Sequence, residues 1–362
     1  FFFKQKTAYE IRNCDWSSDV CSSDLARSSR SAALIRSQCS RTAALSAAMA
    51  LRGGAVCANG RYPRAEFLTL GPGRSDELFA LRTTFGLVVS DDGGQRFRFL
   101  CEEAYQIPDG YDPALAWTRR GSLLAGTPTG LVASSDLCDP LRRPEFEGQE
   151  VVDLAGDAVG NTLVAVAQSR DAVPVVRVAW SNDGGGAWAL PRAGFESEVA
   201  LTVEVAPSDP RRGYLTTSAW IGEGSTLRRS DDGGSTWWVS PFRFGGRPFL
   251  AGVDPARPEV VYLRVELSGS LDGGVLTGGT ALLRSDDAGE RFREVGRTRG
   301  PMLGFALSDD GRHVWIGGPS DEDGVSRSDD GGPFVRINPG GVDCLRWHAG
   351  SLYARSEEHT SE

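Results

Sequence analysis

Short segments in which apolar and polar residues alternate recur along residues 64–354 and predict β-strands. In one stretch ALTVEV (200–205) and GYLTTSAW (213–220) are followed by STLRRS (225–230) and WWVS (237–240). Alternation with a period of two places one side of each strand in a core, and segments of this length are typical of strands. Short turns separate the four segments, so the stretch predicts a four-stranded antiparallel sheet.

A polar motif joins the third and fourth of these segments and recurs along the chain. Four copies fit the pattern Ser-x-Asp-x-Gly-x-x-aromatic, which we name the box, and two more fit it in part. The residues that define the six copies are Ser90, Asp92, Gly94 and Phe97; Ser134 and Asp136; Ser181, Asp183, Gly185 and Trp188; Ser230, Asp232, Gly234 and Trp237; Ser285, Asp287, Gly289 and Phe292; and Ser328, Asp330 and Gly332. Successive copies begin roughly 43–55 residues apart, which is the length of a four-stranded propeller blade.

The residue types of the box suit a tight turn. Short polar side chains such as Ser230 and Asp232 accept hydrogen bonds from turn amides. Gly234 permits a positive φ, and Trp237 can pack between blades. A calcium loop or a catalytic acid pair would also be rich in aspartate, but six regularly spaced copies indicate a structural turn.

The box resembles the Asp-box, or BNR, repeat of sialidase-like propellers. The resemblance covers most of residues 64–354 and implies an all-β fold in which the boxes are structural. We expect a seven-bladed β-propeller whose last blade is truncated, because only VDCLRW (342–347) and SLYA (351–354) follow the sixth box. Alternating strand directions place the boxes on one face and the second-to-third turns, with the blade-to-blade connections, on the other.

The two ends of the chain read differently from the middle. Residues 1–25 and 355–362 resemble translated sequencing-library adapter, and the only lysines, Lys4 and Lys6, lie in the first of these segments. Abundant Arg, Ala and Gly without Lys are typical of a protein from a GC-rich bacterial genome. Residues 26–58 are similar to a signal peptide, and upstream sequence read in frame is the alternative. Residues 59–354 are the predicted propeller, with six blades and half of a seventh.

Charge and cysteine content limit the partners. The net charge is −9, and no basic patch is visible, which argues against nucleic acid. No apolar run is long enough for a transmembrane segment. Cys101 and Cys138 are candidates for a disulfide if the chain is exported, although the predicted strand directions place them on opposite faces. We expect a periplasmic or extracellular protein.

No catalytic or metal motif stands out. Sialidases of this fold carry an Arg-Ile-Pro motif and an arginine triad. Arg61, in GRYP, is a near-match to the Arg-Ile-Pro motif. No second or third arginine of the triad can be assigned. Asp321 and Asp323 lack the spacing of a calcium loop, so we expect neither metal nor cofactor.

The sequence therefore predicts an exported, non-catalytic propeller that binds a protein or a glycan on the face opposite the boxes. Tyr105, Tyr111 and Trp220 are the candidate contact residues on that face. The alternative is a glycoside hydrolase of sialidase or xyloglucanase type, which clustered arginines or a close carboxylate pair near the central axis would favour.

Overall fold

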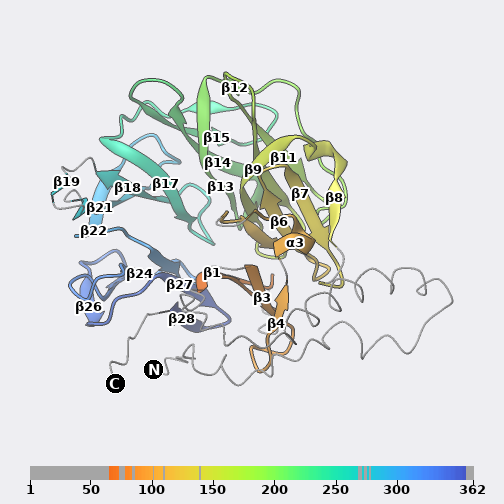
Figure 1. Ribbon diagram of the computed structural model, residues 1–362. Helices are drawn as coiled ribbons and strands as arrows, with labels where there is room; N and C mark the ends of the chain where they lie inside the picture. The colour runs from red at the N-terminus through yellow and green to blue at the C-terminus, as the bar shows by residue number, and fades with distance from the viewer. Residues whose placement is uncertain are drawn as a thin grey trace. The chain divides into compact units, whose positions relative to one another are not determined.

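A computed structural model describes residues 65–72, 78–83, 86–100, 102–108, 111–137, 140–267, 271–272, 275–276 and 279–355. These residues all belong to one compact unit. The predicted all-β propeller is confirmed: six four-stranded sheets and one two-stranded sheet form its blades (Figure 1). The short helix α3 (Glu102–Tyr105) and a 3-10 turn (Pro144–Phe146) are the helical elements of the described residues.

Each four-stranded blade is an antiparallel meander whose strands follow one another in the chain. Blades 1 to 3 comprise β1 (Ala65–Leu70), β2 (Phe79–Thr83), β3 (Gly86–Ser90) and β4 (Arg98–Leu100); β5 (Leu115–Trp117), β6 (Leu123–Thr127), β7 (Gly130–Ser134) and β8 (Leu141–Arg143); and β9 (Gln149–Gly156), β10 (Leu163–Ser169), β11 (Val175–Ser181) and β12 (Phe195–Glu196). Blades 4 to 6 comprise β13 (Glu198–Ala206), β14 (Asp209–Ala219), β15 (Ser225–Ser230) and β16 (Trp238–Val239); β17 (Gly246–Val253), β18 (Val261–Leu267), β21 (Thr280–Ser285) and β22 (Arg293–Thr298); and β23 (Gly304–Leu307), β24 (His313–Gly317), β25 (Val325–Asp329) and β26 (Val335–Asn338). Blade 7 has β27 (Cys344–His348) and β28 (Ser351–Arg355), and a separate hairpin, β19 (Leu271–Asp272) with β20 (Val275–Leu276), lies between β18 and β21 in the chain.

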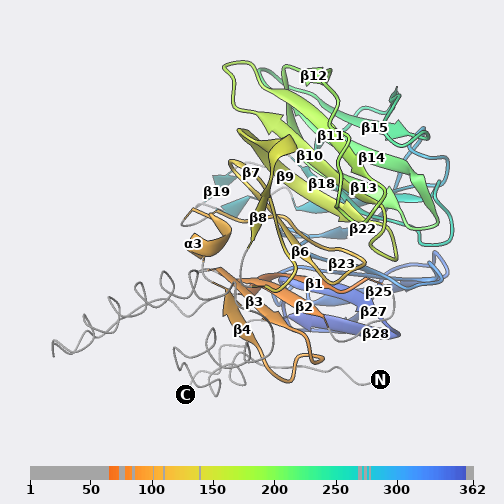
Figure 2. The ribbon, with the colours of Figure 1, turned by 90° about the vertical axis from the view of Figure 1, so that its right-hand side faces the viewer.

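The innermost strands form a closed ring. Each contacts the innermost strand of the next blade, and β27 returns to contact β1. Figure 1 and Figure 2 both place β27 beside β1. Across this closure Nε of Arg346 donates to the carbonyl oxygen of Leu68 at 3.3 Å. Arg355, which we assigned to the appended segment, continues β28, and its Nη1 lies 3.1 Å from Oδ2 of Asp343.

The core is divided into layers because alternate residues of each strand face different neighbours. Leu215 of β14 packs in the cluster between blades 3 and 4, whereas the adjacent Tyr214 packs in the cluster between blades 4 and 5. The hydroxyl of Tyr214 also donates to the carbonyl oxygen of Pro258 at 2.7 Å. Six such clusters lie between consecutive blades from blade 1 to blade 7.

The boxes lie in the turns between the third and fourth strands. In the turn from β15 to β16, Ser230 Oγ donates to Asp232 Oδ1 at 2.9 Å and accepts from the Gly234 amide at 2.8 Å. The Thr236 amide donates to Asp232 Oδ1 at 2.9 Å, which helps to lower the pKa of Asp232 to about 2. The copies that begin at Ser90, Ser181 and Ser285 show the same pattern of bonds.

The box aromatics pack against the preceding blade. Trp237 of blade 4 lies 6.5 Å from Trp180 and 6.0 Å from Phe195, between ring centroids, and both partners belong to blade 3. Trp188 packs against Phe146 in the same way, at 5.3 Å. The boxes of blades 3 and 4 therefore combine a hydrogen-bonded turn with an apolar contact between blades.

We predict that Ser230→Ala lowers the free energy of unfolding by about 1–3 kcal/mol, because the partly buried Gly234 amide loses its acceptor. Ser235→Ala is the matched control, since Ser235 lies in the same turn and is exposed. Urea unfolding of both variants measures the difference. Equal stability of the two variants would contradict a structural role of the box serine.

Two of the six boxes deviate. In blade 2 Ser134 Oγ donates to Asp136 at 3.0 Å. In blade 6 Ser328 Oγ donates to the Gly332 carbonyl at 2.5 Å, and Asp330 pairs with Arg312 at 2.6 Å. The prediction that Asp330 holds turn amides is therefore wrong. The physical reason is Pro333, which occupies a position whose amide the carboxylate accepts in other boxes and has no N–H.

Candidate functional site

The face opposite the boxes, which we call the loop face, carries the second-to-third turns and the blade-to-blade connections. Three chain segments meet on it at blades 3 and 4. The Ser197 amide donates to the Pro174 carbonyl at 3.0 Å, and the Trp220 amide donates to the Ser197 carbonyl at 3.0 Å. These bonds hold the turn at residues 170–174 and the turn at residues 220–224 beside the connection that leads into β13.

Three apolar side chains project from these joined segments. Val173, Trp220 and Ile221 are 51%, 48% and 84% exposed. We name them the Trp220 patch. Exposed apolar side chains are common one at a time, but several on adjoining turns mark a contact surface. The structure thus places Trp220 on an open surface of the loop face.

A buried ion pair supports the strands beneath the patch. Both nitrogens at the end of Arg228 bind Glu198, with Nη1 to Oε2 at 2.7 Å and Nη2 to Oε1 at 2.6 Å. The hydroxyl of Thr217 donates to Glu198 at 2.6 Å. The guanidinium of Arg228 lies 4.2 Å from the centre of the Phe195 ring. The pair joins β13, β14 and β15, the last two of which flank the Trp220 turn.

The two tyrosines differ from Trp220. Tyr105 is almost fully buried in the cluster between blades 1 and 2, so the prediction that it contacts a ligand is wrong. Its place in α3 turns the ring inward, which the sequence did not indicate. Tyr111 is half-buried, and its hydroxyl lies 3.4 Å from Oε1 of Glu150. Burial and the charge of Glu150 raise the pKa of Tyr111, so its hydroxyl is neutral and able to donate.

A second group of polar residues converges on the axis of the ring. Asp153 of β9, Glu204 of β13, Arg264 of β18 and Arg346 of β27 come from four different blades and interact electrostatically. The Val203 amide donates to Asp153 Oδ2 at 2.8 Å, and the Leu154 amide donates to Oδ1 at 2.9 Å. Nη1 of Arg264 donates to the Met302 carbonyl at 3.0 Å. We name these four charged residues the axial cluster.

The environment of the axial cluster shifts its pKa values. Burial raises the pKa of Asp153 to about 6, against the two amides that lower it. Burial and the neighbouring charge of Asp153 raise the pKa of Glu204 to about 8, while the charge of Arg346 opposes this. At neutral pH these shifts favour an ionised Asp153 and a protonated Glu204.

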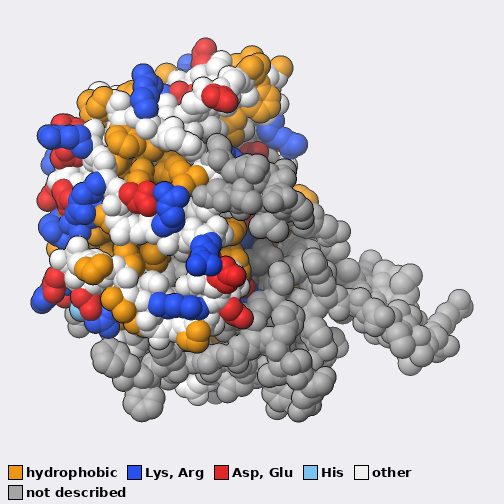
Figure 3. Space-filling model, turned by 90° about the vertical axis from the view of Figure 1, so that its left-hand side faces the viewer, with side chains coloured by type: hydrophobic (Ala, Val, Ile, Leu, Met, Phe, Trp, Pro, Cys, Tyr) orange, Lys and Arg blue, Asp and Glu red, His pale blue; other side chains and the backbone are white. Residues whose placement is uncertain are grey.

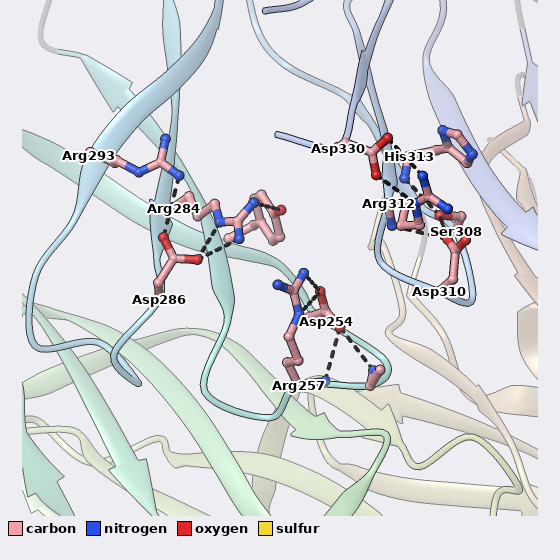
Figure 4. A network of polar contacts seen from close by, with 12 residues as sticks. Asp254, Arg257, Arg284, Asp286, Arg293, Ser308, Asp310, Arg312, His313 and Asp330 are labelled. Carbon is pink, nitrogen blue, oxygen red and sulfur yellow. Dashed lines mark hydrogen bonds and ion pairs between the residues drawn. The ribbon is translucent and has the colours of Figure 1, made fainter. Parts of the chain in front are cut away.

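The box face between blades 5 and 6 carries a network of ion pairs (Figure 4). Arg284 Nε and Arg293 Nη2 reach Asp286 at 2.7 and 3.4 Å. Arg257 binds the buried Asp254 at 2.6 Å. Acidic and basic side chains also alternate over the neighbouring surface, on the side that carries β21, β22 and β26 (Figure 3). This network links turns of adjacent strands.

The remaining predicted residues do not form a metal site. Asp323 accepts from the amides of Arg299 and Gly300, at 2.7 and 3.1 Å. Asp321 accepts instead from the Gly341 amide at 3.1 Å. In the part of the chain that the structure describes, no group of three potential metal ligands occurs. The described helices include none that is long and apolar enough to cross a membrane. Arg61, Cys101 and Cys138 lie outside the described residues.

The axial cluster was not predicted from the sequence. A signal was present, because Asp153, Glu204, Arg264 and Arg346 are charged residues inside otherwise apolar strands. Such residues usually face solvent on a half-exposed strand. Only the ring closure brings four of them to one axis.

Comparisons with known proteins identify the fold alone. No protein-family model and no curated protein matches the chain. An ancestral GH74 enzyme matches with a TM-score of 0.55 and 15% identity. The match covers 82% of this chain but only 39% of the length of that enzyme. Hydrazine synthase from Kuenenia stuttgartiensis matches with a TM-score of 0.59 and 11% identity, over 84% of this chain and 96% of its own. YCF48 from Cyanidioschyzon merolae matches with a TM-score of 0.51 and 13% identity. The match covers 81% of this chain and 93% of YCF48. At these identities the similarity is one of propeller architecture.

Proposed function

We propose that this propeller is an exported, non-catalytic binding protein that recognises a protein or a glycan on its loop face. The observation that carries the proposal is the Trp220 patch. Its three exposed side chains lie on segments that backbone hydrogen bonds hold together. Tryptophan supplies a large apolar area at a low cost in side-chain entropy and is enriched at contact hot spots.

The rigid base of the patch also supports binding. The Glu198–Arg228 pair and the Phe195 ring hold β13, β14 and β15 in register beneath the exposed turn. A surface whose shape is set before contact loses less conformational entropy on association. We further propose that the boxes are Asp-box repeats, whose turn chemistry builds the opposite face of the same blades.

We predict that Trp220→Ala weakens binding at least tenfold and leaves the melting temperature unchanged, because the side chain is half exposed and contributes little to the core. The fluorescently labelled protein is applied to a glycan array and to an array of cell-surface proteins. Leu141→Ala is the matched control, since Leu141 is 71% exposed on the outer strand of blade 2. The proposal fails if neither array captures the wild-type protein, or if both variants bind equally.

A glycoside hydrolase is the second candidate, and the axial cluster favours it. Glycosidases need one carboxylic acid that stays protonated and one carboxylate that stays ionised. Glu204 and Asp153 meet that description at neutral pH. Release of reducing ends from xyloglucan, or turnover of a fluorogenic sialoside, would support this function if Glu204→Gln abolished it. Asp153 already binds two backbone amides, which favours a structural role for its carboxylate.

A further inference from the structure

Blade 4 shows how a row of polar side chains closes against the next blade. Tyr214, Arg229 and Trp238 lie opposite one another on β14, β15 and β16. The hydroxyl of Tyr214 donates to the carbonyl oxygen of Pro258 at 2.7 Å, and Nη1 of Arg229 donates to that of Ala288 at 3.0 Å. The guanidinium of Arg229 also lies 4.6 Å from the centre of the Trp238 ring. Both donors of the row therefore end on backbone oxygens in turns of blade 5.

Blade 5 repeats this row with one change. Tyr262, Arg284 and Arg293 lie opposite one another on β18, β21 and β22. Arg284 directly precedes its box serine, as Arg229 does in blade 4. Arg293 stands in the row where blade 4 has Trp238. The row of blade 5 thus has a second guanidinium in place of an aromatic ring.

The donors of this second row have no acceptor in blade 6. Tyr262 packs in the cluster between blades 5 and 6, so the row faces blade 6. Nη1 of Arg284 donates at 3.1 Å to the hydroxyl of Tyr262, in its own blade. That hydroxyl still has its own proton to donate, and none of the described residues accepts it. Burial raises the pKa of Tyr262, so the hydroxyl keeps this proton at neutral pH.

The deviating box of blade 6 explains the missing acceptor. Gly331 is the third residue after its box serine, the position that Ala288 occupies in blade 5. A side-chain carbon at Gly331 would lie 3.7 Å from Nη1 of Arg284, but that nitrogen donates to the tyrosine hydroxyl instead. Pro333 offers no amide for Asp330 to hold. The altered turn therefore lacks the contact that Ala288 makes in blade 5.

A cavity of about 220 Å³ lies between the row of blade 5 and the turn of blade 6. Its lining includes Tyr262, Arg284 and Arg293 from blade 5, and Gly331 and Phe334 from blade 6. We name it the box-face cavity. One water molecule takes up about 30 Å³, so the cavity has room for a group of several non-hydrogen atoms.

The charges at the box-face cavity favour an anion. Arg284 and Arg293 share one acid, Asp286, which they reach at 2.7 and 3.4 Å (Figure 4). The other acid in the lining, Glu294, is bound by Nε and Nη2 of Arg297. One positive charge therefore has no counterpart at the cavity. The side chain of Arg293 is 57% exposed, so its remaining nitrogens are open to a ligand.

We infer that the box-face cavity binds a phosphate group. Guanidinium groups form charge-assisted hydrogen bonds with phosphate oxygens, and the tyrosine hydroxyl supplies a third donor. Three donors on neighbouring strands suit a group with three or four acceptor oxygens better than a carboxylate, which has two. Asp286 belongs to the repeated turn, because Asp231 holds Arg229 in the same way in blade 4. The site is on the box face and does not depend on binding at the Trp220 patch.

Isothermal titration calorimetry of the full chain tests the proposal. Inorganic phosphate and glycerol phosphate are titrated separately, in a phosphate-free buffer at constant ionic strength. We expect a dissociation constant of about 1 mM or lower for at least one of them and a higher melting temperature when it is present. Binding of inorganic phosphate would support a site for the free ion, and binding of glycerol phosphate alone would support a site for a phosphorylated molecule.

Four variants assign the binding to the cavity. Arg293→Gln should weaken it by about tenfold or more, because a charged donor is lost, and Tyr262→Phe by about two- to tenfold, because a neutral donor is lost. Arg293→Trp recreates the row of blade 4 and should abolish binding without lowering the melting temperature. Arg291→Gln is the matched control, since Arg291 lies in the box turn of the same blade, is 86% exposed and does not line the cavity.

Three results would overturn the proposal. The first is that neither phosphate compound binds the wild-type protein. The second is that Arg293→Gln and Arg291→Gln bind phosphate equally well. The third is that acetate binds as tightly as phosphate, which would make the cavity a site for carboxylates.

Discussion

The Glu204→Gln variant should be more stable than the wild-type protein by about 3–5 kcal/mol at pH 9 and should differ from it by less than about 1 kcal/mol at pH 5. Burial and the charge of Asp153 raise the pKa of Glu204 from 4.5 to about 8. The folded protein therefore holds this proton more tightly than the unfolded chain does. Glutamine resembles the protonated acid in shape and cannot ionise.

The direction of the pH dependence follows from the same shift. Between pH 4.5 and about pH 8 the unfolded chain has lost the proton of Glu204 while the folded protein keeps it. Stability consequently falls as the pH rises through this window and changes no further above it. The pKa of Asp153 is raised to about 6. Asp153 therefore adds a decline in stability at lower pH, and this decline occurs in the wild-type protein and in the Glu204→Gln variant.

Urea unfolding at pH 5, 7 and 9 measures the effect. Glu223→Gln serves as the control, because Glu223 is exposed on the loop face and its substitution should leave the pH dependence intact. Wild-type stability that stays level from pH 7 to pH 9, or a decline between pH 7 and pH 9 that persists in Glu204→Gln, would show that Glu204 does not carry the shift.

Arg228→Met should lower the free energy of unfolding by about 3–5 kcal/mol, the range found when one member of a buried ion pair is removed. The side chains of Arg228 and Glu198 are only 10% and 19% exposed. Methionine fills much of the arginine volume but leaves the carboxylate of Glu198 without its bidentate partner. Thr217 alone cannot compensate the charge.

An exposed pair that is also bidentate provides the control. Arg297 binds Glu294 through Nε at 3.0 Å and Nη2 at 2.8 Å, but the two side chains are 49% and 44% exposed. Arg297→Met should therefore cost less than about 1 kcal/mol. The double variant Glu198→Gln with Arg228→Met should recover part of the loss. If Arg228→Met and Arg297→Met lose similar amounts of the free energy of unfolding, burial does not strengthen the contribution of the Glu198–Arg228 pair to stability.

Much of the fold could be predicted because each blade repeats the same local information. The alternation in ALTVEV and STLRRS matches β13 and β15, and the last two predicted strands match β27 and β28. Local chemistry decides such features: a period of two fixes which residues face a core, and glycine with short polar side chains fixes a turn. The limits of local reasoning appear at Asp330, where Pro333 changes the turn, and at Tyr105, which α3 turns into the core.

The sequence by itself determined the all-β class, the blade length and the positions of the six boxes, because these depend on neighbours within about ten residues. Only the tertiary structure decided which charged side chains meet. Asp153 and Arg346 are far apart in the chain, and each reads as an ordinary exposed residue of an alternating strand. Closing the ring from β27 to β1 brings them, with Glu204 and Arg264, to one axis, where loss of water rather than any local motif shifts the pKa values of the two acids.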